Sequence, residues 1–418
     1  MSQQSSSSLT PVFIGIDWAD RQHDVCIIDA GRSVFQVVKH DPSEIADWLD
    51  QLRKKFPERP ILIALEQGRG GLIHALQEAE GIVIYSINPK QLASFRDAIY
   101  PAGGKSDPKD AELIATFLRN HQQKLRPWQP DDAQTRKLAY LSELRRKLVE
   151  ERKRLGLRLE GTLKNYFPLV LSFGKTISSL LLELLSKWPT LAELKRPHPK
   201  TLRQFLEEHG VRNEEQQTKI VTAIRSAKPL TTDKALLEAH ALYVQSLVRQ
   251  IQELNRSVAQ FDEQLKQTLA KHEDEPIFRS APGAGDTLVP RLIAVFGTDR
   301  ERYQAAEDVQ SYTGIAPITK KSGQSRVVLQ RHACPKFLKQ TFQEFAEQAR
   351  RWSSWSKAFY DYKRSRGVKH QAAVRELAFK WVRILFRLWK SRTLYSENVY
   401  IEQLRRKQSP LLAFLPNP

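Results

Sequence analysis

The stretch Val12-Phe-Ile-Gly-Ile-Asp17 decides how the beginning of this 418-residue chain is interpreted. It is an apolar run of the length of a β-strand, and it ends in an acidic residue. The stretch Ile61-Leu-Ile-Ala-Leu-Glu66 has the same form and also ends in an acidic residue. If the two strands are parallel neighbours in a sheet, their ends lie side by side, and the carboxylates of Asp17 and Glu66 meet there.

The segments around these two strands predict an α/β domain of the RNase H-like (RuvC-like) kind over residues 11–130. Two further strands directly follow the first and can form an antiparallel meander, after which helices and strands alternate. A doubly wound nucleotide-binding fold would instead alternate from its first strand. The expected strands are 12–17, 24–29, 34–40, 61–66 and 82–87, and the expected helices are 42–55 with Ser43 as N-cap, one after residue 66, 89–99 and 107–120.

The rest of the chain is predicted to be mostly helical. Two long helices, at about 131–167 and 235–270, are expected to pair as an antiparallel coiled coil within residues 131–272. The evidence is a heptad pattern, in which apolar residues recur every seven positions at Leu237, Val244, Ile251, Val258 and Leu265. Prolines and a glycine between the two helices predict a helical insertion at about 168–232. A mostly α C-terminal domain is expected at 273–408, and residues 1–10 and 409–418 are expected to be tails.

The charge balance points to nucleic acid as a partner. Lysine and arginine number 66 against 47 aspartate and glutamate residues, so the formal net charge is +19. A chain with this excess of positive charge usually binds a polyanion. We find no apolar run of about 18 residues, and the Gln/Ser-rich start lacks the apolar core of a signal peptide, so a cytoplasmic protein that does not cross a membrane is expected.

Four acidic residues are candidate metal ligands: Asp17, Glu66, Asp107 and Asp110. Asp107 and Asp110 are three residues apart at the start of an expected helix, which places them on one face. Two Mg²⁺ ions about 3.5–4 Å apart can stabilise the attacking and leaving oxygens of a phosphodiester, and such ions prefer carboxylate ligands. Each acid alone also suits a strand end or a helix cap, and only the joint pattern favours metal. Three nearby acids are expected to have such structural roles only, namely Asp24, Asp29 and Asp97.

The sequence resembles the DEDD transposases of bacterial insertion sequences, of the type of insertion-sequence families 110 and 1111. The resemblance spans nearly the whole chain and is weakest at the insertion. Its most specific part is Lys105-Ser-Asp107-Pro-Lys-Asp110-Ala111, which matches the Lys-x-Asp-x-x-Asp-Ala motif of the family. The resemblance implies a Mg²⁺-dependent DNA recombinase of bacterial origin, in which Mn²⁺ can substitute. It also implies that the chain is directed to donor and target DNA by a guide RNA from the element itself. The heptad pattern of the two long helices predicts in addition that they mediate self-association, so a homo-oligomer, a dimer or tetramer, is expected.

A serine near the C-terminal end is the candidate nucleophile. The turns Pro282-Gly-Ala-Gly285 and Gly314-Ile-Ala-Pro317, followed by Ser322-Gly323, resemble the signatures of the family's C-terminal domain. The resemblance places the attacking hydroxyl at Ser322, with a covalent 5′-phosphoserine link to DNA as the product. A serine hydroxyl needs an activating base or metal, and no base neighbours Ser322 in sequence, so the metal site is the expected activator. Ser311 and Ser325 remain alternatives, because Ser-Gly is also an ordinary turn.

Eight basic side chains are expected to contact phosphates: Lys105, Arg145, Arg146, Arg152, Lys320, Lys321, Arg326 and Lys369. Four tryptophans, Trp352, Trp355, Trp381 and Trp389, are expected in the core rather than stacked on bases. Two other functions fit the same residues. One is a RuvC-like structure-selective nuclease that uses water, in which Ser322 takes no part. The other is a catalytically silent nucleic-acid-binding scaffold.

Overall fold

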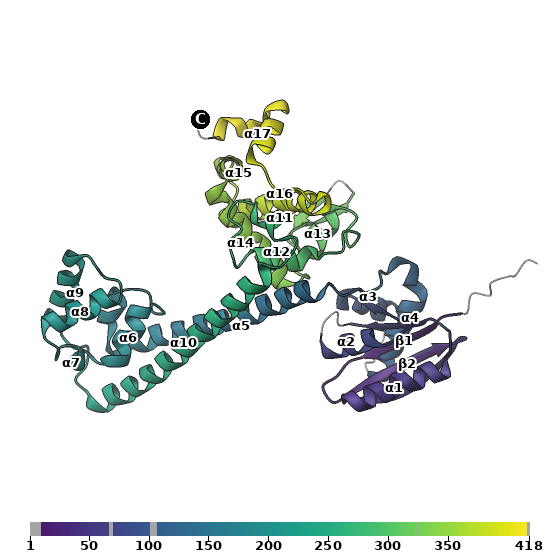
Figure 1. The fold of residues 1–418 in the computed structure, drawn as a ribbon, viewed down its shortest axis with the longest axis horizontal. Coiled ribbons are helices and arrows are strands. Elements are labelled where there is room, and N and C mark those ends of the chain that lie inside the picture. The colour runs from purple at the N-terminus through teal and green to yellow at the C-terminus, as the bar shows by residue number, and fades with distance from the viewer. Residues whose placement is uncertain (1–9, 67–69, 101–106, 324, 416–418) are drawn as a thin grey trace, which may run out of the picture. The chain divides into compact units, whose positions relative to one another are not determined.

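The computed structural model describes residues 10–66, 70–100, 107–323 and 325–415, which are drawn as ribbons in Figure 1. The chain forms two compact units, Met1–Pro130 and Asp131–Pro418. No helix within the described ranges is long and apolar enough to cross a membrane.

The first unit is built on a mixed sheet. Within its described residues, five strands form one sheet in the order β3-β2-β1-β4-β5. The bounds are β1 Val12–Asp17, β2 Gln22–Asp29, β3 Arg32–Lys39, β4 Ile61–Leu65 and β5 Ile82–Ser86. The predicted antiparallel meander of β1, β2 and β3 is present, and β4 and β5 run parallel to β1. This mixed α/β arrangement fits an RNase H-like domain.

Four helices cover the sheet: α1 Pro42–Lys55, α2 Gly71–Glu78, α3 Pro89–Ile99 and α4 Asp107–His121, with a 3-10 turn at Gln122–Lys124. Helix α1 is capped by the Asp41 carboxylate, which accepts the backbone N–H groups of Ser43 at 2.9 Å and Glu44 at 3.2 Å. The predicted N-cap Ser43 is therefore wrong. Pro42 has no N–H to contribute and a backbone angle suited to the first helical position, so the residue before it becomes the cap.

Helix α4 lies against β1 at a glycine. A Cβ atom on Gly15 would come within 2.1 Å of the Ala111 carbonyl oxygen and 2.4 Å of the Ala115 nitrogen. Both distances are far below van der Waals contact, so only glycine permits the helix backbone to rest directly on the strand. The two alanines are themselves fully buried, and they let α4 approach the sheet without large side chains between them.

A long antiparallel helix pair begins the second unit. Helix α5 spans Ala133–Tyr166 and α10 spans Lys234–Leu269, and Figure 1 shows them running side by side. Their direction follows from side-chain partners, because Arg145 pairs with Asp262 whereas Arg152, further along α5, bonds to Asn255. The heptad positions Val244, Ile251 and Val258 are buried within the single chain. The pairing of the two helices is thus present, whereas coiled-coil packing remains a prediction.

The insertion at the far end of the helix pair shares one hydrophobic core with the two long helices. It consists of a 3-10 turn at Pro168–Ser172 and the helices α6 Ser179–Lys187, α7 Leu191–Leu194, α8 Pro199–Glu208 and α9 Glu214–Ser226. Buried leucines of α6 pack with residues of α5 and α10, among them Leu159 and Leu247. The insertion is therefore continuous with the helix pair.

The C-terminal part is helical except for one hairpin. Its elements are α11 Glu275–Arg279, α12 Val289–Phe296, α13 Ala306–Tyr312, β6 Ile318–Ser322, β7 Ser325–Leu329, α14 Lys336–Trp352, α15 Ser354–Ser365, α16 His370–Ser391, α17 Glu397–Arg406 and a 3-10 turn at Pro410–Phe414. Trp355, Trp381 and Trp389 are fully buried, as predicted. Trp352 is 73% exposed, so its placement in the core was wrong: it ends α14, beyond the last buried turn. The segment expected as a tail contains Pro410–Phe414, where Leu411 is buried.

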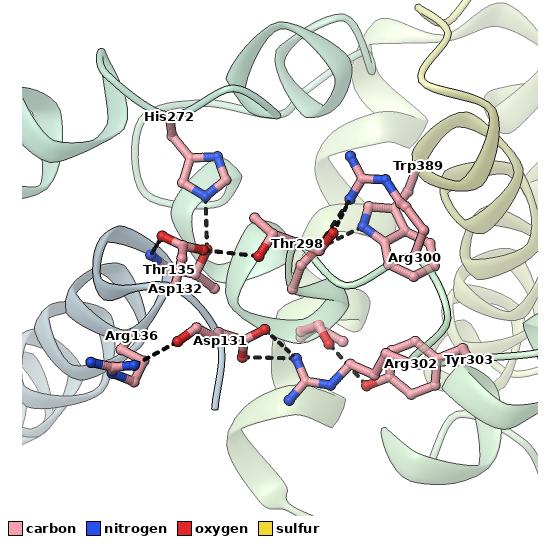
Figure 2. A network of polar contacts seen from close by, with 12 residues as sticks. Asp131, Asp132, Thr135, Arg136, His272, Thr298, Arg300, Arg302, Tyr303 and Trp389 are labelled. Atoms are coloured by element: carbon pink, nitrogen blue, oxygen red, sulfur yellow. Dashed lines mark hydrogen bonds and ion pairs between the residues drawn. The ribbon is translucent and has the colours of Figure 1, made fainter. Parts of the chain in front are cut away.

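A partly buried polar network joins the start of α5 to the end of α10 (Figure 2). The Asp132 carboxylate caps α5 and also accepts the hydroxyls of Thr135 at 2.5 Å and Thr298 at 3.0 Å. The same Thr135 oxygen lies 2.8 Å from His272 Nε2, which therefore donates to it. Burial disfavours ionisation of Asp132, but these hydrogen bonds outweigh it and lower its pKa. Two ion pairs flank the network, Arg302–Asp131 and Arg300–Asp274.

The contact at Gly15 gives a stability prediction. Gly15→Ala should destabilise the first unit by about 1–3 kcal/mol or more, because α4 must move off the sheet to make room for a methyl group. Gly161→Ala is the matched control, since a Cβ there would meet nothing within 4 Å. Gly161 lies inside α5, and alanine should stabilise it by about 1 kcal/mol.

The measurement is thermal unfolding followed by circular dichroism, together with hydrogen exchange of the β1 amides. Gly15→Ala should lower the midpoint and speed exchange in β1, whereas Gly161→Ala should do neither. A Gly15→Ala protein with native exchange rates would show that the helix–strand contact is not tight.

Candidate active site

The candidate acids Asp17 and Glu66 share the face of the sheet that α4 covers. Side chains alternate along a strand, and Gly15, two residues before Asp17, is the residue that touches α4. On β4, Ala64 packs with residues of α4, and Glu66 follows it by two positions. Ile16 and Leu65 are partners in the parallel register, so Asp17 and Glu66 come next at neighbouring strand ends. The predicted juxtaposition of the two strand ends is present.

The other two candidate acids begin α4. Asp107 is exposed, whereas Asp110 is only 6% exposed. The Asp110 carboxylate forms an ion pair with Arg96 of α3, with Nη2 and Oδ1 2.9 Å apart. A buried carboxylate needs such a counter-charge, because removing it from water is costly when it is unpaired. Asp110 is therefore held in place at the helix start by a neighbouring cation.

Asp24, which the sequence assigned to a structural role, lies beside this group. It is the register partner of Asp17 in the antiparallel pair of β1 and β2. Cys26, two residues on, packs with Ala111 of α4, so Asp24 belongs to the same face. Burial raises the pKa of Asp24, and the negative charge of Asp107 raises it further. The sequence did contain a signal for this position. Asp24 and Cys26 are two residues apart on one strand, so their side chains lie on the same face of the sheet, which is the face that α4 covers.

The acidic side chains on this face are of the type that binds a divalent cation. Across the described ranges, no three His, Cys, Asp or Glu side chains are arranged to hold a metal ion together. Convergence of the four carboxylates within ligand distance of one ion thus stays a prediction. The available donors on this face are carboxylate oxygens, which Mg²⁺ and Mn²⁺ prefer. A cation there would also offset the repulsion between Asp107 and Asp24 that the raised pKa reflects.

Ser322 ends a strand of an exposed hairpin. It is the last residue of β6, it is exposed, and its register partner across the hairpin is Ser325. Gly323 follows with φ 55°, a left-handed conformation that glycine adopts without strain and that suits a tight hairpin turn. The sequence predicted a loop here, and the short polar strand Ile318–Ser322 was missed. Ser311, the other alternative, is exposed on α13.

The basic residues expected to contact phosphates divide into two groups. Arg145 pairs with Asp262, Arg146 pairs with Glu150 and lies over the Phe337 ring, and Arg152 bonds to Asn255. These three guanidinium groups thus already have partners within the helical unit. By contrast, the side chains of Lys320, Lys321 and Lys369 are exposed. Lys105 and the side chain of Arg326 lie outside the part of the chain that the structure describes.

Comparisons with known proteins found matches for the N-terminal and the C-terminal parts of the chain. A family model described as a transposase matches residues 14–168, and one described as a transposase of the IS116/IS110/IS902 family matches residues 275–361. A Streptomyces coelicolor protein assigned as the transposase of the mini-circle element IS117 is 28% identical, over 93% of this chain and 96% of that protein. An uncharacterized 44.8 kDa protein of insertion element IS116 from Streptomyces clavuligerus is 25% identical, over 92% of this chain and 96% of that protein.

The coupling between Asp107 and Asp24 gives a prediction about ionisation. Asp107→Asn should lower the pKa of Asp24, because it removes one negative charge while leaving Asp24 buried. The measurement is a pH titration of selectively ¹³C-labelled aspartate carboxyls, with the Asp24 signal assigned by its loss in Asp24→Asn. Asp29→Asn, at the opposite end of β2, is the control and should leave the Asp24 titration unchanged. An Asp24 midpoint that stays constant in Asp107→Asn would mean that the two carboxylates do not interact.

Proposed function

Because the chain belongs to the IS110 family of insertion-sequence transposases, we propose that it cuts and exchanges DNA strands through a Mg²⁺-dependent attack of a serine hydroxyl on a phosphodiester. The observation that carries the metal dependence is the shared face of the first unit. Asp17 and Glu66 follow neighbouring parallel strands there, and α4, packed on the same face at Gly15, begins with Asp107 and Asp110.

Four carboxylates would hold the metal: Asp17, Glu66, Asp107 and Asp110. When bound, Mg²⁺ stabilises negative charge on the attacking and leaving oxygens of a phosphodiester. The chain's own contribution is to position the ligands. Asp17 is fixed by its strand and Asp110 by burial against Arg96, so little side-chain freedom is lost when a ligand binds.

Ser322 would supply the attacking hydroxyl. Its Oγ forms a bond to phosphorus, the bond from phosphorus to the 3′ oxygen breaks, and the hydroxyl proton passes to that leaving oxygen. The product is a 5′-phosphoserine link and a free 3′-hydroxyl, and reversal with another 3′-hydroxyl rejoins the strands. Exposure at the end of a hairpin suits this role, and the exposed Lys320 and Lys321 beside it can offset phosphate charge.

Two further partners belong to the proposal. We propose that the chain acts as a homo-oligomer, because strand exchange requires at least two cleaved phosphodiesters and each chain carries one Ser322. A guide RNA rests on the family resemblance, and the net charge of +19 is compatible with binding RNA as well as DNA.

The metal assignment predicts a specific loss of cation binding. Asp17→Asn and Asp107→Asn should each weaken Mn²⁺ binding at least about tenfold, since each removes one charged ligand while keeping the side-chain size. Asp97→Asn is the control, because Asp97 is an exposed acid on α3 outside the group. Isothermal titration calorimetry measures the affinity. Unchanged binding in both ligand variants would place the metal elsewhere.

The nucleophile assignment predicts a covalent intermediate. Incubated with Mg²⁺ and a nicked DNA substrate, the native protein should form a denaturant-resistant adduct that mass spectrometry maps to Ser322. Ser322→Ala should form none, yet bind DNA within about twofold of native, because one hydroxyl adds little to a phosphate-dominated affinity. Ser325→Ala, changed directly across the hairpin, should keep the adduct.

Other results would redirect the assignment. An adduct at Ser311 or Ser325 would move the nucleophile to that residue. Mg²⁺-dependent strand breakage without any adduct would favour a water-using RuvC-like nuclease. DNA binding with no breakage at all would favour a non-catalytic scaffold.

A further inference from the structure

A groove of about 480 Å³ lies between α16 and α17. The α16 residues that line it are Lys380, Arg383, Ile384, Arg387 and Leu388, at the spacing of one helix face. On α17 they are Val399, Tyr400 and Gln403, and Lys407, the residue that caps the end of this helix, continues the same spacing. Two helix faces at this spacing usually close on each other through apolar side chains. Here three of the five α16 positions are cationic, and the groove stays open.

The groove is strongly and uniformly positive. Of the described side chains that line it, four are cations, Lys380, Arg383, Arg387 and Lys407, and none is acidic. Arg383, Arg387 and Lys407 are exposed, whereas Lys380 is half-buried. Burial lowers the pKa of Lys380, and the positive charges of Lys363, Arg383 and Lys407 lower it further. Like charges held together in this way favour binding of an anion.

Helices α16 and α17 carry three acidic residues; two of them are engaged elsewhere, and the third, Glu402, does not line the groove. Glu376, on α16, pairs with Lys363 at 2.5 Å. Glu397, at the start of α17, accepts the hydroxyls of Ser354 at 2.8 Å and Tyr395 at 2.6 Å. Neither carboxylate lines the groove, so its positive charge is left for an external partner.

The walls of the groove are held in place before any partner binds. Helix α16 ends at Ser391. The next residue, Arg392, has a left-handed backbone (φ 53°) that turns the chain, and the N–H of Thr393 bonds to the Leu388 carbonyl at 3.1 Å. Helix α17 is anchored to α15 by Glu397, and the Tyr400 ring packs on Trp355 with centroids 4.1 Å apart. A preformed site loses little conformational entropy on binding.

We propose that this groove binds the phosphodiester backbone of DNA. This contact would be separate from the candidate catalytic residues, which are the four carboxylates and Ser322. Two arginines at i and i+4 present forked donors that match phosphate oxygens, and Lys407 adds a charge from the opposite wall. The hydroxyl of Ser396, which also lines the groove, can supply a neutral donor. Exposed Leu394 and Val399, 61% and 55% accessible, can contact the sugars between phosphates. We name DNA as the partner because DNA is the substrate of a transposase, so this inference rests on the proposed function.

The test compares two triple variants of the full-length protein. The groove variant is Arg383→Gln/Arg387→Gln/Lys407→Gln. The control is Arg203→Gln/Arg212→Gln/Lys219→Gln, which removes the same charges from exposed positions in the insertion. Fluorescence anisotropy measures the affinity for a duplex DNA over a series of salt concentrations. Circular dichroism checks that both variants fold.

If each groove cation neutralises one phosphate, the salt slope should fall by about 2.7, and DNA binding at 0.15 M salt should weaken about 100-fold. The control should stay within about twofold of native. Equal losses in both variants would mean that only net charge matters, and unchanged DNA affinity in the groove variant would also overturn the proposal. A loss confined to an RNA duplex of the same sequence would make the groove an RNA site and overturn it as well.

The outcome is independent of the serine chemistry. At DNA concentrations that saturate the groove variant, the Ser322 adduct should form at the native level. An absent adduct in the native protein would refute the proposed nucleophile while leaving the groove result intact. A normal adduct with an unchanged salt slope would refute the groove alone.

Discussion

The contact between α4 and β1 at Gly15 is the constraint on which the first unit depends. Because no side chain separates helix from strand there, the backbone of α4 lies directly on the sheet. That position brings the start of α4, with Asp107 and Asp110, to the edge where β1 and β4 end. It also brings Asp107 close enough to raise the pKa of Asp24 on β2. A side chain at Gly15 would move the helix, and the acidic residues at its start would move with it.

In the second unit, some cationic side chains pair with groups of the protein itself, whereas others remain available to an external partner. The guanidinium groups of Arg145 and Arg152 join α5 to α10, and that of Arg302 pairs with Asp131 at the start of α5. Such pairs help to hold the long helix pair and the polar network at its base. The cations of the β6–β7 hairpin and of the groove between α16 and α17 are not used in this way.

Much of the first unit could be predicted, because strand and helix periodicity are local properties. The strand Val12–Asp17 and the helix Pro89–Ile99 match their expected bounds. Predictions failed where neighbouring residues compete for one position, such as a helix cap, or where burial depends on a segment distant in sequence. Asp41 rather than Ser43 caps α1, because Pro42 takes the first helical position. Trp352 is exposed although three other tryptophans are buried, because burial depends on the opposing surface and not on residue type.

The sequence by itself determined the order of strands and helices in the first unit, the four candidate acids, the candidate serine and the positive charge, since these follow from residue type and spacing. Only the tertiary structure decided which acids share a face, and it added Asp24 through the pairing of β2 with β1. It also decided which cations are already paired: Arg145 has a partner more than a hundred residues away, whereas Arg383 lines an open groove. The physical reason is that pairing and burial depend on contacts between distant segments, which local patterns do not encode.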